Sequence, residues 1–291
     1  MTEPDWLVQG FEQNRPRLRA VAYRMLGSFT EADDAVQEAW LRLRQADASV
    51  DNLGAWLTTI VSRVCLNVLR SRRSRPETPI GVHVPDPIVS RVDGTTPEEE
   101  ALLADSVGLA LHIVLDTLPP AERLAFVLHD MFDLPFDEIA PIVGRTPVAA
   151  RQLASRARRQ VRGADVPDAD LGGQREVVDA FFAAAHTGDF EALVAVLDPD
   201  VVLRADGGTA RADASVVLHG PAAVAGQAII FDRPGMQLRP ALVNGAAGVV
   251  VAMDGDPSAV LGFTVTRGRI VQIDVLADPE RIGGLDLAGI D

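Results

Sequence analysis

A segment in the middle of the chain carries, in order, the signals that end one helix, form a tight turn and begin a second helix. Residues 136–143 have the apolar spacing of a short amphipathic helix. Gly144 can take the left-handed conformation that ends it, and Thr146 followed by Pro147 is typical of a capped helix start. This order predicts a helix-turn-helix, the motif that places its second helix in the major groove of DNA.

The second helix of this motif is predicted to bury Val148, Leu153 and Ala157 and to turn polar residues outward. Its N-terminal end supplies candidates for contact with base edges, and its arginines supply candidates for contact with phosphates. These candidates are Thr146, Ala149, Arg151, Gln152, Ser155, Arg156, Arg158 and Arg159. A surface helical hairpin with a solvated basic face is the alternative interpretation.

Two breaks rich in proline, glycine and aspartate divide the chain. Up to the second break, apolar residues recur at a spacing of three and four, as in amphipathic helices. Beyond it, two helical runs precede short β-branched runs separated by turn signals such as Asn244-Gly245 and Asp254-Gly255. We therefore predict two all-α domains followed by an α+β domain with a curved, mostly antiparallel sheet. The predicted parts are a helical domain at 1–75, a Pro-rich linker at 76–97, a helix-turn-helix domain at 98–163, a linker at 164–173 and the α+β domain at 174–291.

The net charge of −14 is unevenly distributed, so it does not exclude a nucleic-acid partner. Residues 1–165 hold 19 arginines against 23 acidic residues, whereas residues 166–291 hold 8 against 18. The arginines of the first part also gather in two clusters, one at residues 70–75 and one at residues 151–162. Clustered cations are what binding to phosphates requires.

The composition argues against metal, disulfide and membrane chemistry. Cys65 is the sole cysteine, so it has no partner for an internal disulfide and cannot by itself form a zinc site. No run approaches the ~20 apolar residues of a membrane helix, and the first ten residues do not resemble a signal sequence. We expect a cytoplasmic protein without a metal or a cofactor.

The helix-turn-helix and the residues before it resemble region 4 of the extracytoplasmic-function RNA polymerase sigma factors, in the order LPPAERLAFVLHD, FDEIA and VGRTPVAARQLASRARR. Residues 33–42, DDAVQEAWLR, resemble region 2.2 of the same family, and residues 56–73 resemble its regions 2.3 and 2.4. The resemblance implies a chain that binds core RNA polymerase and promoter DNA and initiates transcription.

The resemblance also implies roles for residues. Region 4 would bind the minus-thirty-five element and the polymerase β flap. The β′ clamp helices would be bound by Asp34, Gln37 and Glu38. The minus-ten element would be opened and read by Trp56, Arg63, Asn67, Arg70, Arg72 and Arg73. By residue type alone, the tryptophan is more typical of a core, and the three polymerase-binding candidates are typical of a solvated helix face.

The C-terminal part resembles the SnoaL-like fold in FFAAA at 181–185, GDFEAL at 188–193 and LDPDV at 197–201. A sigma factor with this extension resembles the SigJ-like subgroup, in which the domain controls polymerase activation in cis. Three subgroup motifs are present in altered form, at 83–87, 206–211 and 278–282, and His83 replaces a tryptophan of the first. The residues implied in this control are Pro85, Asp86, Pro87, Asp206, Gly207, Gly208, Asp278 and Pro279.

Other functions stay open at this point. Related folds include enzymes, and the candidate acid and base groups are Asp200, Asp206, Asp213, His186 and His219. Nothing in the sequence orders them into a pair, so we predict no catalytic residue. A C-terminal pocket that senses a small ligand is a further possibility. A ligand-responsive DNA-binding regulator is the main alternative, and it would not need the region 2 segment.

Overall fold

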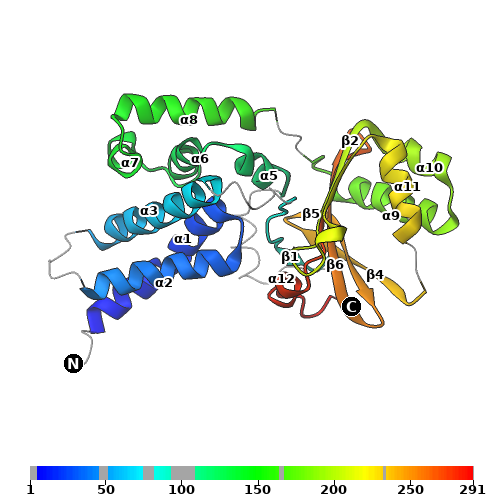
Figure 1. Cartoon of the computed structure of the whole chain (residues 1–291), viewed down its shortest axis with the longest axis horizontal. Helices are drawn as coiled ribbons and strands as arrows, with labels where there is room; N and C mark the ends of the chain where they lie inside the picture. Colours follow the sequence, from blue (N-terminus) through cyan, green and yellow to red (C-terminus); the bar gives the residue numbers. More distant parts are fainter. Residues whose placement is uncertain are drawn as a thin grey trace. The chain divides into compact units, whose positions relative to one another are not determined.

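The computed structural model describes residues 5–45, 52–74, 82–92, 109–163, 167–231 and 234–290. The chain divides into two compact units (Figure 1). We call Met1–Thr78 with Val114–Gly163 the helical unit, and Pro79–Ile113 with Ala164–Asp291 the C-terminal unit. Each unit is described by itself.

The helical unit is built from amphipathic helices that bury one face each. Its elements are α1 (Asp5–Leu26), α2 (Phe29–Gln45), α3 (Leu53–Ser74), the end of α5 (Leu109–Thr117), α6 (Pro120–Phe126), a π-helical turn (Val127–Met131), α7 (Phe136–Val143) and α8 (Pro147–Val161). Leu18, Met25, Leu57 and Leu66 are almost fully buried where α1, α2 and α3 pack together. The all-α architecture predicted for this part is confirmed.

A buried arginine joins the first three helices to the helix-turn-helix. Arg123 on α6 is 2% exposed, and its Nε and Nη2 donate to the carbonyl oxygen of Arg24 on α1 at 3.1 and 2.9 Å. Its Nη1 pairs with the carboxylate of Asp116. Burying a guanidinium is costly unless it is paired and hydrogen-bonded, so these contacts fix how α6 lies on α1.

The C-terminal unit is formed around a seven-stranded sheet in the order β1-β4-β5-β6-β7-β2-β3. The strands are β1 (Val89–Ser90), β2 (Leu197–Asp206), β3 (Val216–His219), β4 (Met236–Val243), β5 (Ala246–Met253), β6 (Asp256–Thr266) and β7 (Arg269–Leu276). Every neighbouring pair is antiparallel except β2 and β7. Asn244 and Asp254 have positive φ and are followed by glycines with positive φ, as two-residue hairpin turns require. The predicted α+β domain with a mostly antiparallel sheet is confirmed.

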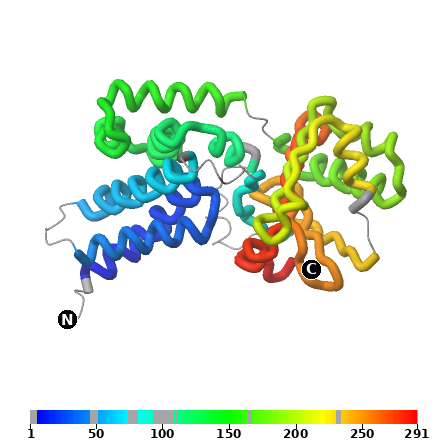
Figure 2. Tube along the Cα trace, in the orientation of Figure 1, coloured from blue at the N-terminus to red at the C-terminus, as the bar shows by residue number. Residues whose placement is uncertain are grey.

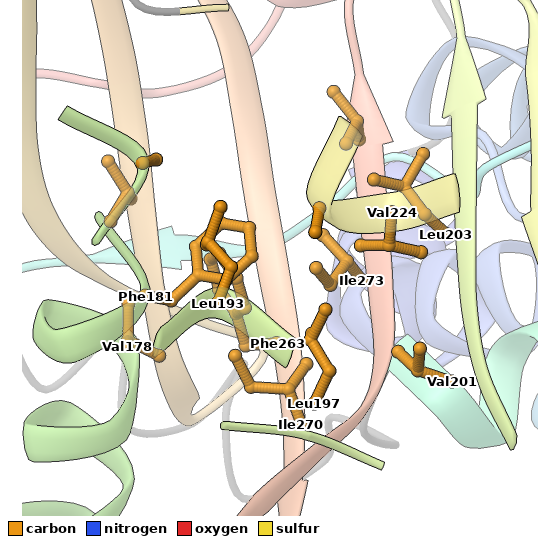
Figure 3. Packing of buried hydrophobic residues seen from close by; sticks show 14 of the residues in the cluster. Val178, Phe181, Leu193, Leu197, Val201, Leu203, Val224, Phe263, Ile270 and Ile273 are labelled. Carbon is orange, nitrogen blue, oxygen red and sulfur yellow. The ribbon is translucent and has the colours of Figure 1, made fainter. Parts of the chain in front are cut away.

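Both faces of this sheet are covered. Helices α9 (Leu171–Thr187), α10 (Phe190–Val196) and α11 (Pro221–Phe231) lie on one face, where Phe181, Leu193 and Phe263 pack with strand residues (Figure 3). The other face is covered by Val84, Leu109 and the C-terminal end, which includes α12 (Pro279–Gly283). Because both faces are buried, β5 is apolar throughout, and the burial of β5 and of β6 after its first residues does not alternate.

Residues 82–92, which fall in the segment predicted as a Pro-rich linker, belong to the C-terminal unit (cyan in Figure 2). Val89 and Ser90 pair with β4, and the N–H of Ile88 donates to Oδ1 of Asn244 at 3.1 Å. β1 is an edge strand, so Pro85 and Pro87 can lie just before it although proline has no N–H group to donate to a neighbouring strand. Residues 76–81 and 93–97 of that segment, and the predicted domain start at 98, lie outside the described residues.

Candidate nucleic-acid interface and regulatory clasp

The turn of the helix-turn-helix has the geometry that its sequence predicts. Gly144 ends α7 in the left-handed conformation, with φ 68°, and its N–H donates to the carbonyl of Ala140. Thr146 caps α8 because its Oγ1 accepts from the N–H of Ala149 at 3.3 Å, and Pro147 is the first helical residue. α8 therefore begins with a fixed orientation against α6 and α7 (Figure 1).

The buried face of α8 is made of small residues. Ala150, Ala154 and Ala157 are fully buried, and Leu153 is half-buried. The prediction that Val148 is buried was wrong, since its side chain is 63% exposed. With 3.6 residues per turn, position 148 lies on the side of the helix opposite to the three alanines.

The candidates for DNA contact on α8 differ in what they touch. Ala149 and Arg158 are half-buried, and the exposed ones are Thr146, Arg151, Gln152, Ser155, Arg156 and Arg159. Arg156 pairs with Glu122 at 3.2 Å and Arg158 pairs with Asp130 at 2.5 Å, while the guanidinium of Arg151 lies over the ring of Phe136. Within the described part of the chain, the structure gives Gln152, Ser155 and Arg159 no hydrogen-bond or ion-pair partner.

A second polar face lies along α3. Arg63, Asn67 and Arg70 are exposed at a spacing of four and three, and Trp56, half-buried, lies two turns before Arg63 on the same side. Arg72 points elsewhere, because it pairs with the carboxylate of Glu31 on α2 and with the carbonyl of Leu26.

Arg70 and Arg73 border an open hollow beside the first turn of α6. Pro119, Pro120 and Ala121 form the rest of its lining. Arg73 is exposed, as Arg70 is, so five of the six minus-ten candidates, Arg63, Asn67, Arg70, Arg72 and Arg73, are exposed to solvent.

The candidates for polymerase contact lie on α2, on the side away from its buried Ala35, Val36 and Ala39. Asp34 and Gln37 are exposed. Glu38 is half-buried and forms an ion pair with Arg42 at 2.8 Å. The face is thus an exposed acidic and amide surface.

The three motifs predicted for control meet in one cluster, which we call the Arg281 clasp: Asp86, Asp206, Arg281 and the peptide of Val84. Arg281 donates from Nε to Asp86 at 2.6 Å, from Nη1 to Asp206 at 2.7 Å and from Nη2 to the carbonyl of Val84 at 2.5 Å. Asp206 also accepts from the N–H of Val84 at 3.0 Å. Residues more than a hundred positions apart in the chain are thereby tied together, and Arg281 is the member that the sequence analysis did not single out.

Electrostatics within the clasp favour the ionised form of Asp206. Burial alone raises the pKa of Asp206, but hydrogen bonds from His83, Val84 and Gly208 and the charge of Arg281 outweigh it and lower the pKa to about 2. The Nδ1 atom of His83 lies 3.6 Å from the carboxylate of Asp206.

The remaining residues predicted for control shape the clasp. Pro85 and Pro87 are buried on either side of Asp86. Asp278 caps α12 by accepting from the N–H of Glu280 at 3.0 Å, and Pro279 is its first residue. Gly207 and Gly208 leave no room for a Cβ atom, because it would clash with the carbonyl of Arg211 and the carboxylate of Asp278 respectively.

Most of the acid and base candidates of an enzyme lie at the protein surface. Asp200, Asp213, His186 and His219 are exposed, and Asp206 belongs to the clasp. A buried carboxylate that the sequence analysis missed is Asp274 on β7. Burial raises the pKa of Asp274 to about 7, opposed by a hydrogen bond from Gln272 and the charge of Arg204. It borders a cavity of about 10 Å³, which has room for a water molecule and for no larger ligand.

Two features are absent from the described part of the chain. None of its helices combines the length and the apolar character that crossing a membrane requires. Nor does it hold a cluster of three or more histidine, cysteine or carboxylate side chains placed to bind a metal ion.

Comparison with known proteins identifies the family to which these helices and this sheet belong. Residues 11–75 match the Sigma-70 region 2 family and residues 109–161 match the Sigma-70 region 4 family. The chain is 37% identical to the ECF RNA polymerase sigma factor SigJ of Mycobacterium tuberculosis, over 96% of this chain and 94% of SigJ. It is 35% identical to the probable ECF RNA polymerase sigma factor SigI of that species, over 98% of both chains. The crystal structure of SigJ matches with a TM-score of 0.73 at 36% identity, covering 96% of this chain and 99% of SigJ.

Proposed function

This chain belongs to the extracytoplasmic-function RNA polymerase sigma factors, and on that premise we propose that it reads a promoter with two faces of its helical unit while its C-terminal unit controls it in cis. As a sigma factor it binds core RNA polymerase and promoter DNA, and it acts where the polymerase is, in the cytoplasm. Its role is recognition and not catalysis.

The outward face of α8 contacts the minus-thirty-five element. Gln152 lies in its N-terminal half and Ser155 near its middle, and both carry groups that hydrogen-bond to base edges, while Arg159 follows one turn after Ser155. Arg156 and Arg158 change partners on binding, from Glu122 and Asp130 to phosphates. The absence of partners for Gln152, Ser155 and Arg159 among the described residues supports this assignment.

The α3 face contacts the minus-ten element. Opening a duplex costs a few kcal/mol per unstacked base, and the protein recovers this by holding extruded bases and tracking the strand with cations. Arg63, Asn67 and Arg70 offer donors along one line, with Trp56 at its N-terminal end. Arg72 instead stabilises α3 against α2, and we remove it from the minus-ten contacts. Asp34, Gln37 and Glu38 on α2 bind the β′ clamp helices, and region 4 binds the β flap.

Control in cis operates through the Arg281 clasp, which is the observation that carries this part of the proposal. The clasp holds residues 84–86, which lie between region 2 and region 4, on the C-terminal sheet. The two regions need independent placement to reach two promoter elements, yet Arg123 joins them in the helical unit. We infer that the clasp and the Arg123 contacts favour a closed state, which polymerase and promoter open.

The experiment that tests the sigma role measures binding of the full-length chain to its own upstream promoter duplex, with and without core RNA polymerase. Tight, sequence-specific binding only in the presence of polymerase is the expected result. Specific binding by the chain alone would instead identify a conventional DNA-binding regulator. A core polymerase loaded with another sigma factor on that factor's promoter serves as the control for polymerase quality.

A further inference from the structure

An apolar side chain stands exposed on the face of α8 that is otherwise polar. Val148 is 63% exposed, and it is the one large apolar side chain of α8, a fully described helix, that lies open to solvent. The helix has another apolar surface for packing, formed by Ala150, Ala154 and Ala157, so Val148 contributes nothing to that core.

Val148 belongs to a continuous stripe. Counting from Val148, the residues at four, seven and eleven positions further are Gln152, Ser155 and Arg159. This spacing places all four on one side of an α-helix, opposite the three buried alanines. The order along the stripe is apolar, amide, hydroxyl and cation, from the N-terminal end of α8 toward its C-terminal end.

The position of Val148 in α8 is fixed by the turn before it. Thr146 caps the helix and Pro147 is its first residue, so Val148 is the second. In a helix-turn-helix the N-terminal residues of the second helix lie nearest the base edges. The exposed valine therefore stands at the end of the stripe that enters the groove most deeply.

Among the groups that base pairs present in the major groove, the methyl group is that of thymine at position 5, and G·C pairs have none. Building on the proposed role of α8 at the minus-thirty-five element, we propose that Val148 is a specificity-determining residue that selects a thymine by packing on this methyl group. The polar residues of the stripe make the hydrogen bonds and phosphate contacts around it. Val148 thus gives the stripe a preference for thymine over cytosine, which has a hydrogen atom in place of the methyl group.

The test is transcription from a promoter library by holoenzyme assembled from core RNA polymerase and the full-length chain. The library starts from the protein's own upstream promoter and randomises the minus-thirty-five window, and the transcripts are sequenced. Wild type is compared with Val148→Ala, which removes the methyl groups, and with Val148→Ile, which keeps an apolar contact. Because the side chain is exposed and alanine favours helices, neither variant disturbs the fold.

We expect wild type and Val148→Ile to prefer thymine at one position, and Val148→Ala to lose that preference by about fourfold, the factor for one buried methyl group. Preferences at the other positions stay unchanged. Replacing that thymine by deoxyuridine, which lacks the methyl group, should weaken initiation by wild type to the same extent and leave Val148→Ala unaffected.

Three outcomes would overturn the inference. An unchanged thymine preference in Val148→Ala removes the valine from base readout. A uniform loss at every sequence shows that Val148 contacts the polymerase or supports the fold instead. If wild type shows no sequence preference and no promoter-dependent transcription, while a control sigma factor works, the proposed function fails and this inference fails with it.

Discussion

The outward face of α8 and the Arg281 clasp use the same kinds of polar group in opposite ways. On α8, the described surroundings give Gln152, Ser155 and Arg159 no partner. In the clasp, the guanidinium of Arg281 donates to two carboxylates and a carbonyl at once. Exposed groups without partners are free to exchange water for a nucleic acid, whereas a buried and satisfied network fixes one arrangement of the chain. The comparison separates a surface for recognition from a device for control.

The largest effect is expected from breaking the clasp. In Arg281→Ala the carboxylates of Asp86 and Asp206, 4% and 5% exposed, lose their cation. Leaving buried charges unpaired costs about 3–5 kcal/mol, so Tm of the C-terminal unit should fall by about 10 °C. Arg281→Lys should recover part of this, because an ammonium cannot hold all three acceptors in one plane.

Scanning calorimetry of the full-length chain measures the Tm of the C-terminal unit, with Arg267→Ala as the matched control. Arg267 is exposed in a turn of the same unit, and its removal should leave Tm nearly unchanged. Equal stabilities of Arg281→Ala and Arg267→Ala would mean that the clasp contributes nothing to the fold.

The next effect on stability is expected from a second buried carboxylate, Asp274, whose pH dependence can be compared with that of Asp206. Its folded-state pKa of about 7 lies above the ordinary value of 3.8, so the folded state holds the proton more tightly. The contribution of this group to stability is therefore lost as pH rises from about 4 to about 7. Asp206 behaves in the opposite way: its pKa of about 2 means that its contribution is present above about pH 4 and is lost as pH falls toward 2.

Urea unfolding at several pH values tests this difference. Between pH 4 and pH 8, the stability of Asp274→Asn should increase relative to that of wild type by about 4 kcal/mol, because the substitution removes the ionisation of a buried group. Asp200→Asn, at an exposed carboxylate, is the control. A pH profile of Asp274→Asn that runs parallel to that of wild type would show that Asp274 is not the group that titrates.

The smallest effect concerns the unpartnered face. Arg159→Ala should weaken promoter binding by holoenzyme about fivefold at 0.15 M salt and reduce the slope of log affinity against log salt by about one. Arg158→Ala should do less, because Arg158 gives up an ion pair with Asp130 on binding DNA. The measurement is the affinity of holoenzyme for the promoter over a series of salt concentrations. A salt slope in Arg159→Ala equal to that of wild type would remove Arg159 from the phosphate contacts.

The sequence predicted best what short-range chemistry determines. The turn of the helix-turn-helix rests on Gly144 and Thr146, and the hairpins of the sheet rest on pairs such as Asn244-Gly245, so a few adjacent residues were enough. The clasp was reached only as three separate motifs, because Arg281 and Asp86 lie 195 positions apart and no local pattern reports their contact.

The burial of Val148 was mispredicted for a related reason. Periodicity assigns large apolar residues to the core, but α8 packs closely through alanines, and the valine falls on the opposite side. Asp274 was missed because a carboxylate in a strand reads as a solvent-facing residue, and only the covering of both sheet faces buries it. In both cases tertiary packing decided what residue type alone could not.

The measurement that tests the central claim most directly is in vitro transcription by core RNA polymerase from the protein's own upstream promoter, comparing full-length wild type, Arg281→Ala and Arg267→Ala. If the chain is a sigma factor, wild type and Arg267→Ala should both initiate transcription at this promoter. If the clasp also favours a closed state, Arg281→Ala should initiate several-fold more transcription, at a temperature where this variant stays folded. Equal initiation by all three would contradict control through the clasp, and no initiation by any of them, with a competent polymerase, would contradict the sigma assignment.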